Sequence, residues 1–290
     1  MKKLGVGLVV LAAIFWGLSG GLAGILMEKG WNPLVITFYR GAVGFICVVI
    51  WMIARTKYYS YGSLRKMIFW SLLAGLGVTG NFSFYFTSIS HSGVAIASVL
   101  MYTAPIFVFI ISFILKMERV TLFKIIAMLI VLGGMGLLTG VIPNGIGQLN
   151  LLGITAGLLS GLSYAIFIFA FNYALKYGEP PAILSTALFA FSLILFPFID
   201  HEQAISVFYS EDIFWFIVLG LIGAGLSFFF YVKGLRATLP SVASVVAMAE
   251  PVTASLFGGL FLGQFLTLTQ IIGMAVILIT ITILSTRKSA

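Results

Sequence analysis

The sequence predicts an all-α integral membrane protein with ten transmembrane helices, arranged as two inverted repeats of five. Three observations predict this fold class. The chain of 290 residues is 61% hydrophobic and only 8% charged, whereas about 25% of the residues in a soluble domain are charged. Long apolar segments follow one another along the chain, and the basic residues alternate between the loops that join them. No water-soluble fold could bury so much apolar surface, so we expect the chain to lie in a membrane.

A helix crosses the hydrocarbon layer of a membrane, about 30 Å thick, with roughly 20 apolar residues. The segments of this kind are 4–27, 33–54, 67–90, 94–115, 125–142, 149–175, 180–199, 213–232, 239–263 and 266–286. Arg40 and Glu250 are the only charged residues inside them. The segments are continuously apolar, and lipid offers no partner for unpaired backbone groups, so we expect helices and not barrel strands. The segment 4–27 is too long for the apolar core of a signal peptide and is predicted to be an uncleaved first helix.

Outside the predicted spans, all but one of the basic residues fall on the same side of the membrane. That side carries Lys2, Lys3, Arg55, Lys57, Arg65, Lys66, Lys116, Arg119, Lys124, Lys176, Lys233, Arg236, Arg287 and Lys288. The other side carries Lys29 and an acidic cluster of Asp200, Glu202, Glu211 and Asp212. This asymmetry predicts a multi-pass protein of the cytoplasmic membrane with both termini in the cytoplasm. It also accounts for the net charge of +8 without a nucleic-acid partner, and the lone Cys47 provides no disulfide or metal site.

The second half of the sequence repeats features of the first. The matching features are Ala97-Ser98-Val99 with Ala243-Ser244-Val245, Pro105 with Pro251, Phe84-Tyr85 with Phe230-Tyr231, and Gly17-Leu18-Ser19 with Gly161-Leu162-Ser163. We therefore expect two five-helix repeats, residues 1–142 and 143–290. Because five is odd, the second repeat must enter the membrane from the opposite side. Inverted repeats are typical of carriers, in which rocking of the halves opens a central site to each side in turn.

Several motifs resemble the drug/metabolite transporter superfamily, in particular proteins with two EamA-type domains. The residues concerned are Pro105, Glu118-Arg119-Val120-Thr121 and Gly133-Gly134 in the first half, and Glu250-Pro251, Gly263, Leu266-Thr267, Gln270 and Gly273 in the second. The family pattern has an acidic residue where this chain has Gln264. The resemblance implies a ten-helix transporter of the drug/metabolite transporter fold. Its members export or import amino acids, amines and other metabolites, and many of them export.

Two charged residues lie within the predicted spans. Arg40 lies about 10 Å below one end of its span by helical rise, so it either anchors the helix or faces a cavity, where it would bind a carboxylate or pair with Glu250. Glu250 lies near the middle of its span, too deep to reach water along the helix. Its counterpart in the first repeat is Ala104, so the acid is not part of the repeated scaffold. We interpret Glu250 as a substrate or proton-coupling group.

Polar and aromatic residues away from the span ends are the other candidates for the substrate site. They are Trp16, Asn81, Tyr85, Tyr102, Tyr164, Asn172 and Tyr173. Aromatic side chains surround cationic groups well, although most aromatic residues in such a chain serve packing. Pro105 and Pro251 are predicted to kink their helices and to free the backbone carbonyl groups of Met101 and Ala247.

Pairs of glycines four residues apart allow helices to approach closely. The pairs are Gly17 and Gly21, Gly136 and Gly140, Gly157 and Gly161, and Gly259 and Gly263. We interpret them as packing within one chain, which leaves a monomer or a homodimer open.

The sequence therefore predicts a secondary transporter that moves a small metabolite by alternating access. The predicted substrate is an amino acid, an amine or a related zwitterion or cation, the predicted direction is export, and proton coupling through Glu250 is a hypothesis. No metal or cofactor is expected. Two alternatives stay open, an importer of the same fold and an intramembrane enzyme. Gly17-Leu18-Ser19-Gly20 matches the serine motif of rhomboid proteases, but no histidine is predicted at the depth of Ser19.

Overall fold

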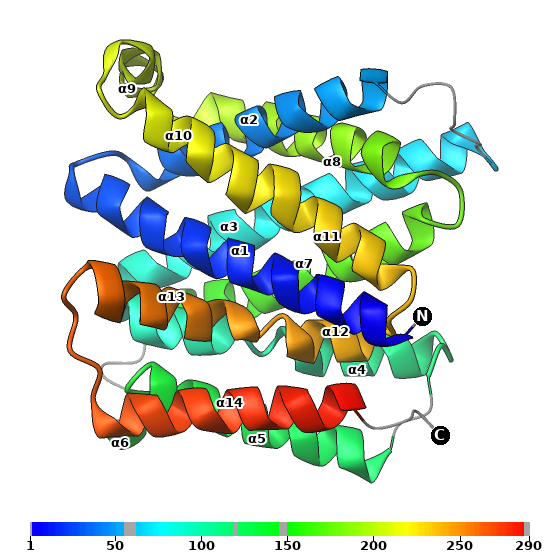
Figure 1. The fold of residues 1–290 in the computed structure, drawn as a ribbon, viewed down its shortest axis with the longest axis vertical. Coiled ribbons are helices and arrows are strands. Elements are labelled where there is room, and N and C mark those ends of the chain that lie inside the picture. The colour runs from blue at the N-terminus through cyan, green and yellow to red at the C-terminus, as the bar shows by residue number, and fades with distance from the viewer. Residues whose placement is uncertain (1, 55–61, 119–120, 145–149, 287–290) are drawn as a thin grey trace.

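The computed structural model describes residues 2–54, 62–118, 121–144 and 150–286. In the first half the helices are α1 (Lys2–Glu28), α2 (Pro33–Ala54), α3 (Leu64–Met101), α4 (Ala104–Ile114), α5 (Leu122–Leu138) and α6 (Val141–Asn144). The described residues contain no strand, which confirms the predicted all-α class. The helices lie side by side as one bundle (Figure 1).

The second half begins with α7 (Leu151–Ala174), and its α-helices continue with α8 (Pro180–Leu195), α9 (His201–Ser206), α10 (Ile213–Gly220), α11 (Ser227–Leu235), α12 (Pro240–Val246), α13 (Ala249–Phe261) and α14 (Leu268–Thr286). Two short 3-10 turns, η2 (Phe196–Phe198) and η3 (Val207–Tyr209), flank α9. A π-helical segment, η4 (Leu221–Leu226), joins α10 to α11.

Seven helices of the described residues are long and apolar enough to span a membrane, and three shorter apolar helices accompany them. The number differs from ten because the helix boundaries differ from the predicted segments. α3 contains the third predicted span and the start of the fourth, with a break at Gly93, whose φ of 80° and ψ of 163° are not helical. α4, α5 and α14 are shorter than the predicted segments. Ten crossings therefore stay a prediction.

The two halves pack through equivalent helices. α1 packs against α11 and α13 of the second half, and α7 packs against α3 and α4 of the first. Two further pairs, α2 with α8 and α5 with α14, each join corresponding helices, and α4 packs against α12. α1 starts with Gly5 against the backbone of Gly234, whereas α7 starts at the opposite end, with Gly153 against Ser92. The first helices of the halves thus run in opposite directions.

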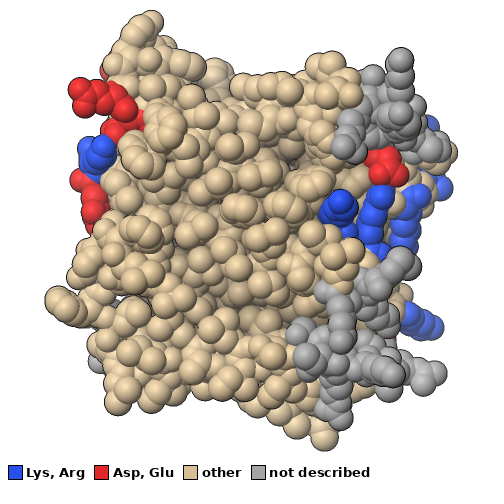
Figure 2. Space-filling model, viewed as in Figure 1, with Lys and Arg blue, Asp and Glu red and all other residues tan. Residues whose placement is uncertain are grey.

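Charged residues gather at the two ends of the bundle, and on the face shown in Figure 2 the surface between them is almost free of charge. One end, the basic end, holds helix ends that contact one another and carries Arg65, Lys66, Lys116, Lys124, Lys176, Lys233 and Arg236. The other, the acidic end, carries Lys29, Asp200, Glu202, Glu211 and Asp212. Arg55, Lys57, Arg119, Arg287 and Lys288 lie outside the described residues. The uncharged belt is the face expected against lipid.

Candidate functional site

A cavity of about 660 Å³ lies between the two halves. Its walls come from the acidic-end parts of α1, α2, α3, α5 and α13, and from Gln264 and Gln270. The deeper wall includes Tyr164 and Phe167 of α7 and Phe228 of α11. The cavity therefore extends from the middle of the bundle toward the acidic end.

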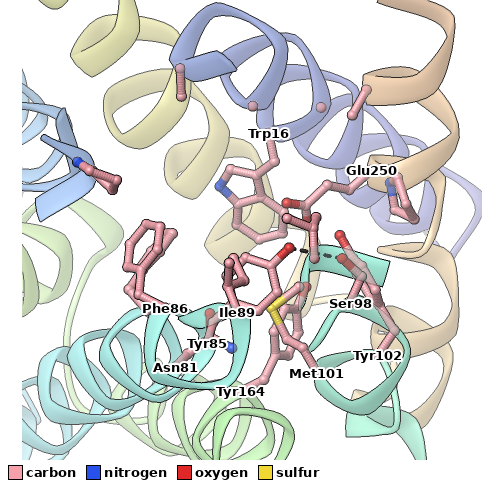
Figure 3. Close-up of a pocket in the computed structure, with 18 of the residues that line it drawn as sticks. Trp16, Asn81, Tyr85, Phe86, Ile89, Ser98, Met101, Tyr102, Tyr164 and Glu250 are labelled. Carbon is pink, nitrogen blue, oxygen red and sulfur yellow. Dashed lines mark hydrogen bonds between the residues drawn. The ribbon is translucent and has the colours of Figure 1, made fainter. Parts of the chain in front are cut away.

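Glu250 contributes a carboxylate to this cavity (Figure 3). It is the second residue of α13, directly after a break in which Ala247 and Met248 leave the helical pattern. Its backbone N–H donates to the carbonyl oxygen of Ala247 at 2.9 Å. The prediction that the carbonyl group of Ala247 is free is therefore wrong. The chain makes a tighter turn before Pro251, and in this turn the carbonyl oxygen of Ala247 accepts a hydrogen bond. On the first-half side, α3 ends at Met101 and α4 begins at Ala104, so the chain breaks at the equivalent place before Pro105.

Arg40 lines the same cavity from α2. Its Nε donates to the carbonyl oxygen of Gly223 in η4 at 3.1 Å, and its guanidinium carbon lies 5.1 Å from the ring centre of Phe82. A Cβ atom on Gly223 would lie 2.8 Å from Arg40 Nε, so glycine is needed for this contact. The ion pairs of the described residues do not include Arg40 with Glu250. The two opposite charges thus share one cavity without neutralising each other directly.

Aromatic side chains form the deep end of the cavity. Trp16 of α1 packs against Phe228 and Tyr231, with ring centres 5.2 Å and 4.9 Å apart. Tyr164 packs against Phe167 at 4.5 Å. Trp16, Tyr164, Phe167 and Phe228 line the cavity and form an uncharged surface there, with Trp16 beside Glu250 (Figure 3). Such a surface suits the apolar part of a small substrate.

Polar side chains that line the cavity differ in the hydrogen bonds that they make within the protein. The amide of Asn81 donates to the carbonyl oxygen and hydroxyl of Ser160 at 3.1 Å and 3.0 Å. Asn81 therefore ties α3 to α7 through its amide nitrogen. The hydroxyl of Tyr85 is hydrogen-bonded to that of Ser98 at 2.8 Å. The hydroxyl of Tyr164 is buried and has no hydrogen-bond partner among the described residues.

The structure brings together seven of the eight predicted binding residues, namely Trp16, Arg40, Asn81, Tyr85, Tyr102, Tyr164 and Glu250. Asn172 does not line the cavity. It lies more than two turns beyond Tyr164 on α7, toward the basic end, where the neighbouring Tyr173 stacks on Trp70 at 4.7 Å. Its polarity within an apolar segment suggested a site, but the depth of the cavity floor could not be inferred from one helix.

Sequence reasoning missed several lining residues, among them Thr37, Phe82, Ser98 and Met101. Spacing could have found three of them. Thr37 precedes Arg40 by three residues, Phe82 precedes Tyr85 by three and Ser98 precedes Tyr102 by four, and residues at these separations share a helix face. Met101 is three to four residues from none of the predicted binding residues.

The rhomboid-like motif has a structural role. The buried hydroxyl of Ser19 donates to the carbonyl oxygen of Trp16 at 2.9 Å. His91 contacts Ser90 and the carbonyl oxygen of Thr87, and the ring of His201 packs against Phe196. Both histidines thus lie in exposed surroundings at the acidic end, and neither is placed to act as a base for Ser19.

Comparisons with known proteins agree with the arrangement in two halves. A model of the EamA-like transporter family matches residues 3–140 and again residues 151–286. An uncharacterized transporter of Archaeoglobus fulgidus is 29% identical over 276 residues, which are 95% of this chain and 94% of that protein. YwfM, an uncharacterized transporter of Bacillus subtilis, is 25% identical over 96% of this chain and 92% of its own length.

Two further similarities extend over almost the whole chain. YicL, an uncharacterized inner membrane transporter of Salmonella typhimurium, is 27% identical over 96% of this chain and 93% of its own length. A solved crystal structure superposes with a TM-score of 0.76 at 17% identity, over 98% of this chain and 96% of the other. At that identity the match shows the fold alone.

Proposed function

Because the chain belongs to the EamA-like transporter family, we propose that it is a secondary transporter that exports a small zwitterionic metabolite across the cytoplasmic membrane. The central observation is the cavity between the halves, which holds Arg40 and Glu250 and opens toward one end. Its volume of about 660 Å³ lies within the range usual for small-molecule sites. A substrate bound there would be released to the other side when the halves rock.

The two charges support a zwitterionic substrate such as an amino acid. The guanidinium of Arg40 would bind a carboxylate, for which its planar donors are well suited. The carboxylate of Glu250 would bind an ammonium group, and Tyr164 and Trp16 would surround the rest of the molecule. Since Arg40 and Glu250 form no ion pair with each other, each can take one charge of the substrate.

Glu250 also provides a way to couple transport to a proton gradient. A protonated Glu250 has no charge with which to hold an ammonium group, so proton entry from outside would release the substrate there. The proton would then move inward as the halves rock back. This exchange gives one proton taken up for each substrate released, and it needs no other ionisable group. Export is the direction that the family resemblance favours.

The test is transport by purified protein in proteoliposomes with an imposed pH gradient. Labelled amino acids and amines found by counterflow would serve as substrates. We expect Glu250→Gln to abolish gradient-driven transport of amino acids and of amines. We expect Arg40→Lys to raise the KM for amino acids by about tenfold, because lysine binds a carboxylate with one point charge. The KM for amines should not change in Arg40→Lys. Glu202→Gln, which changes an acid outside the cavity, is the matched control.

Two outcomes would contradict the proposal. Transport by Glu250→Gln that keeps its full dependence on the pH gradient would remove Glu250 from coupling. If the pH gradient drives substrate accumulation only on the side of the membrane that the basic end faces, the protein is an importer.

A further inference from the structure

A buried carboxylate is one of the groups that join the two halves at the basic end. Glu118, which follows α4 in the first half, has a side chain that is only 4% exposed. It accepts hydrogen bonds from both the backbone N–H, at 3.2 Å, and the hydroxyl of Ser241 at the start of α12 in the second half. Lys124 of α5 forms an ion pair with it at 2.7 Å. Glu118 thus joins the halves at the end opposite the open cavity.

The residues of the second repeat that are equivalent to Glu118 and Lys124 are uncharged. Pro105 corresponds to Pro251, 146 residues later, and Thr121 and Leu122 correspond at the same offset to Thr267 and Leu268. At this offset the counterparts are Gln264 for Glu118, Gln270 for Lys124, and Ala95 for Ser241. The second repeat therefore has two neutral amides where the first has an ion pair.

Among the described residues, these counterparts form no hydrogen bond like that between Glu118 and Ser241. Gln264, Gln270 and Ala95 all line the cavity, and the side-chain oxygen of Gln270 accepts from the backbone N–H of Thr267 at 2.9 Å. The contact that closes the basic end is thus absent from the acidic end, where the corresponding residues border the opening.

A second pair of equivalent positions shows the same asymmetry. Tyr85 is hydrogen-bonded to Ser98 on the cavity side. Their counterparts are Tyr231 and Ser244, and these are not joined. The hydroxyl of Tyr231 is fully buried without a partner among the described residues, and Ser244 donates to the carbonyl oxygen of Ser241. The tyrosine and the serine are therefore hydrogen-bonded to each other in the first repeat and separate in the second.

We propose that Glu118 and Ser241 form an inner latch, and that Gln264 and the backbone N–H of Ala95 form the equivalent outer latch when the cavity closes at the acidic end. The inner latch is ionic and the outer one neutral. Hydrogen bonds to charged groups are about twice as strong as neutral ones, so this asymmetry holds the protein open toward the acidic end. The inference rests on the proposed transport function, because alternating access requires both states.

The equilibrium can be measured by alkylation of cysteines at two equivalent positions. Val108 is fully buried on the latched side, and its counterpart Ala254 lines the cavity. In a background with Cys47→Ala, one protein would carry Val108→Cys and another Ala254→Cys. A maleimide should react rapidly with the cysteine of Ala254→Cys and slowly with that of Val108→Cys.

Two latch variants should reverse this order. Glu118→Gln weakens the inner latch, and the double variant Gln264→Glu with Gln270→Lys builds the ionic pair into the outer one. In each we expect alkylation of Val108→Cys to rise by about tenfold and that of Ala254→Cys to fall, the effect of changing one charge-assisted hydrogen bond to a neutral one or the reverse. Glu179→Gln is the matched control, because its ion pair with Arg236 lies at the basic end within the second half.

Opposite changes at the two positions would support the latch. Unchanged rates, or rates that rise together as in a loosened fold, would overturn it. The double variant keeps the inner latch intact, so it tests the proposal even if Glu118→Gln does not fold. Alkylation needs no substrate, so a shift in these rates without measurable transport would reject the transport function and leave the latch in place.

Discussion

At the residue scale, Asp212 is an ionisable group outside the predicted spans that is held by partners far away in the sequence. Asp212 precedes α10 and is bonded to Lys29 and to the indole Nε1 of Trp31, both from the loop after α1. These hydrogen bonds from Lys29 and Trp31 hold the pKa of Asp212 below its ordinary value of 3.8. They also join the two halves at the acidic end.

The pKa of Asp212 predicts a pH-dependent contribution to stability. Its pKa is lower in the folded protein, so the contribution is complete above pH 3.8 and is lost as the pH falls through the lower folded value. We expect Asp212→Asn to lower the free energy of unfolding by about 1 kcal/mol at neutral pH. The difference from wild type should shrink below pH 3.8, as measured by thermal unfolding in detergent. A difference that stayed constant with pH would show that the carboxylate charge is not responsible.

At the element scale, broken helices and close glycine contacts place the site. α13 starts beside α1, and the backbone of Glu250 lies against Gly17. A Cβ atom on Gly17 would lie 2.5 Å from the carbonyl oxygen of Glu250 and 2.5 Å from the Cβ of Thr253. Gly161 of α7 is also close to the carbonyl oxygen of Met101, at 3.0 Å for a Cβ atom. For Gly17 and Gly161 the close packing is between helices of the same chain, and it lies beside the two helix breaks.

This packing predicts a large difference between two glycines of the same helix. Gly17→Ala should lower the free energy of unfolding by about 1–3 kcal/mol, because the added methyl group meets backbone that cannot move without shifting α13. Gly24→Ala has nothing within 4 Å of the added atom, and alanine favours a helix over glycine by up to about 1 kcal/mol. Thermal unfolding of the purified variants measures both. Equal stability of the two variants would contradict the close approach of α1 and α13.

At the scale of the whole molecule, the basic and acidic ends predict how the protein lies in the cell. The basic end should face the cytoplasm and the acidic end, with the cavity opening, the outside. In a Cys47→Ala background, an impermeant maleimide added to intact cells should label Glu202→Cys. It should label Lys66→Cys only after the cells are permeabilised. The reverse pattern would place the basic end outside.

The sequence by itself determined the membrane class, the two related halves and the separation of charge, because composition and spacing carry that information directly. It also identified most cavity residues, since Arg40 and Glu250 stand out as charges in apolar segments and Tyr102 and Tyr164 as buried polar groups. The broken helices were predicted at Pro105 and Pro251, although not the tighter turn that occupies Ala247.

Only the tertiary structure decided which of these residues meet. Asn172 had the same local signature as Asn81 but lies beyond the cavity floor, and Met101 lines the site without a spacing signal. Which end is closed also needed the tertiary structure, because the sequence aligns Glu118 with Gln264 but does not show that Glu118 meets Ser241 across the two halves. Contacts between helices far apart in the chain depend on how the halves dock, and local patterns along one helix do not encode that docking.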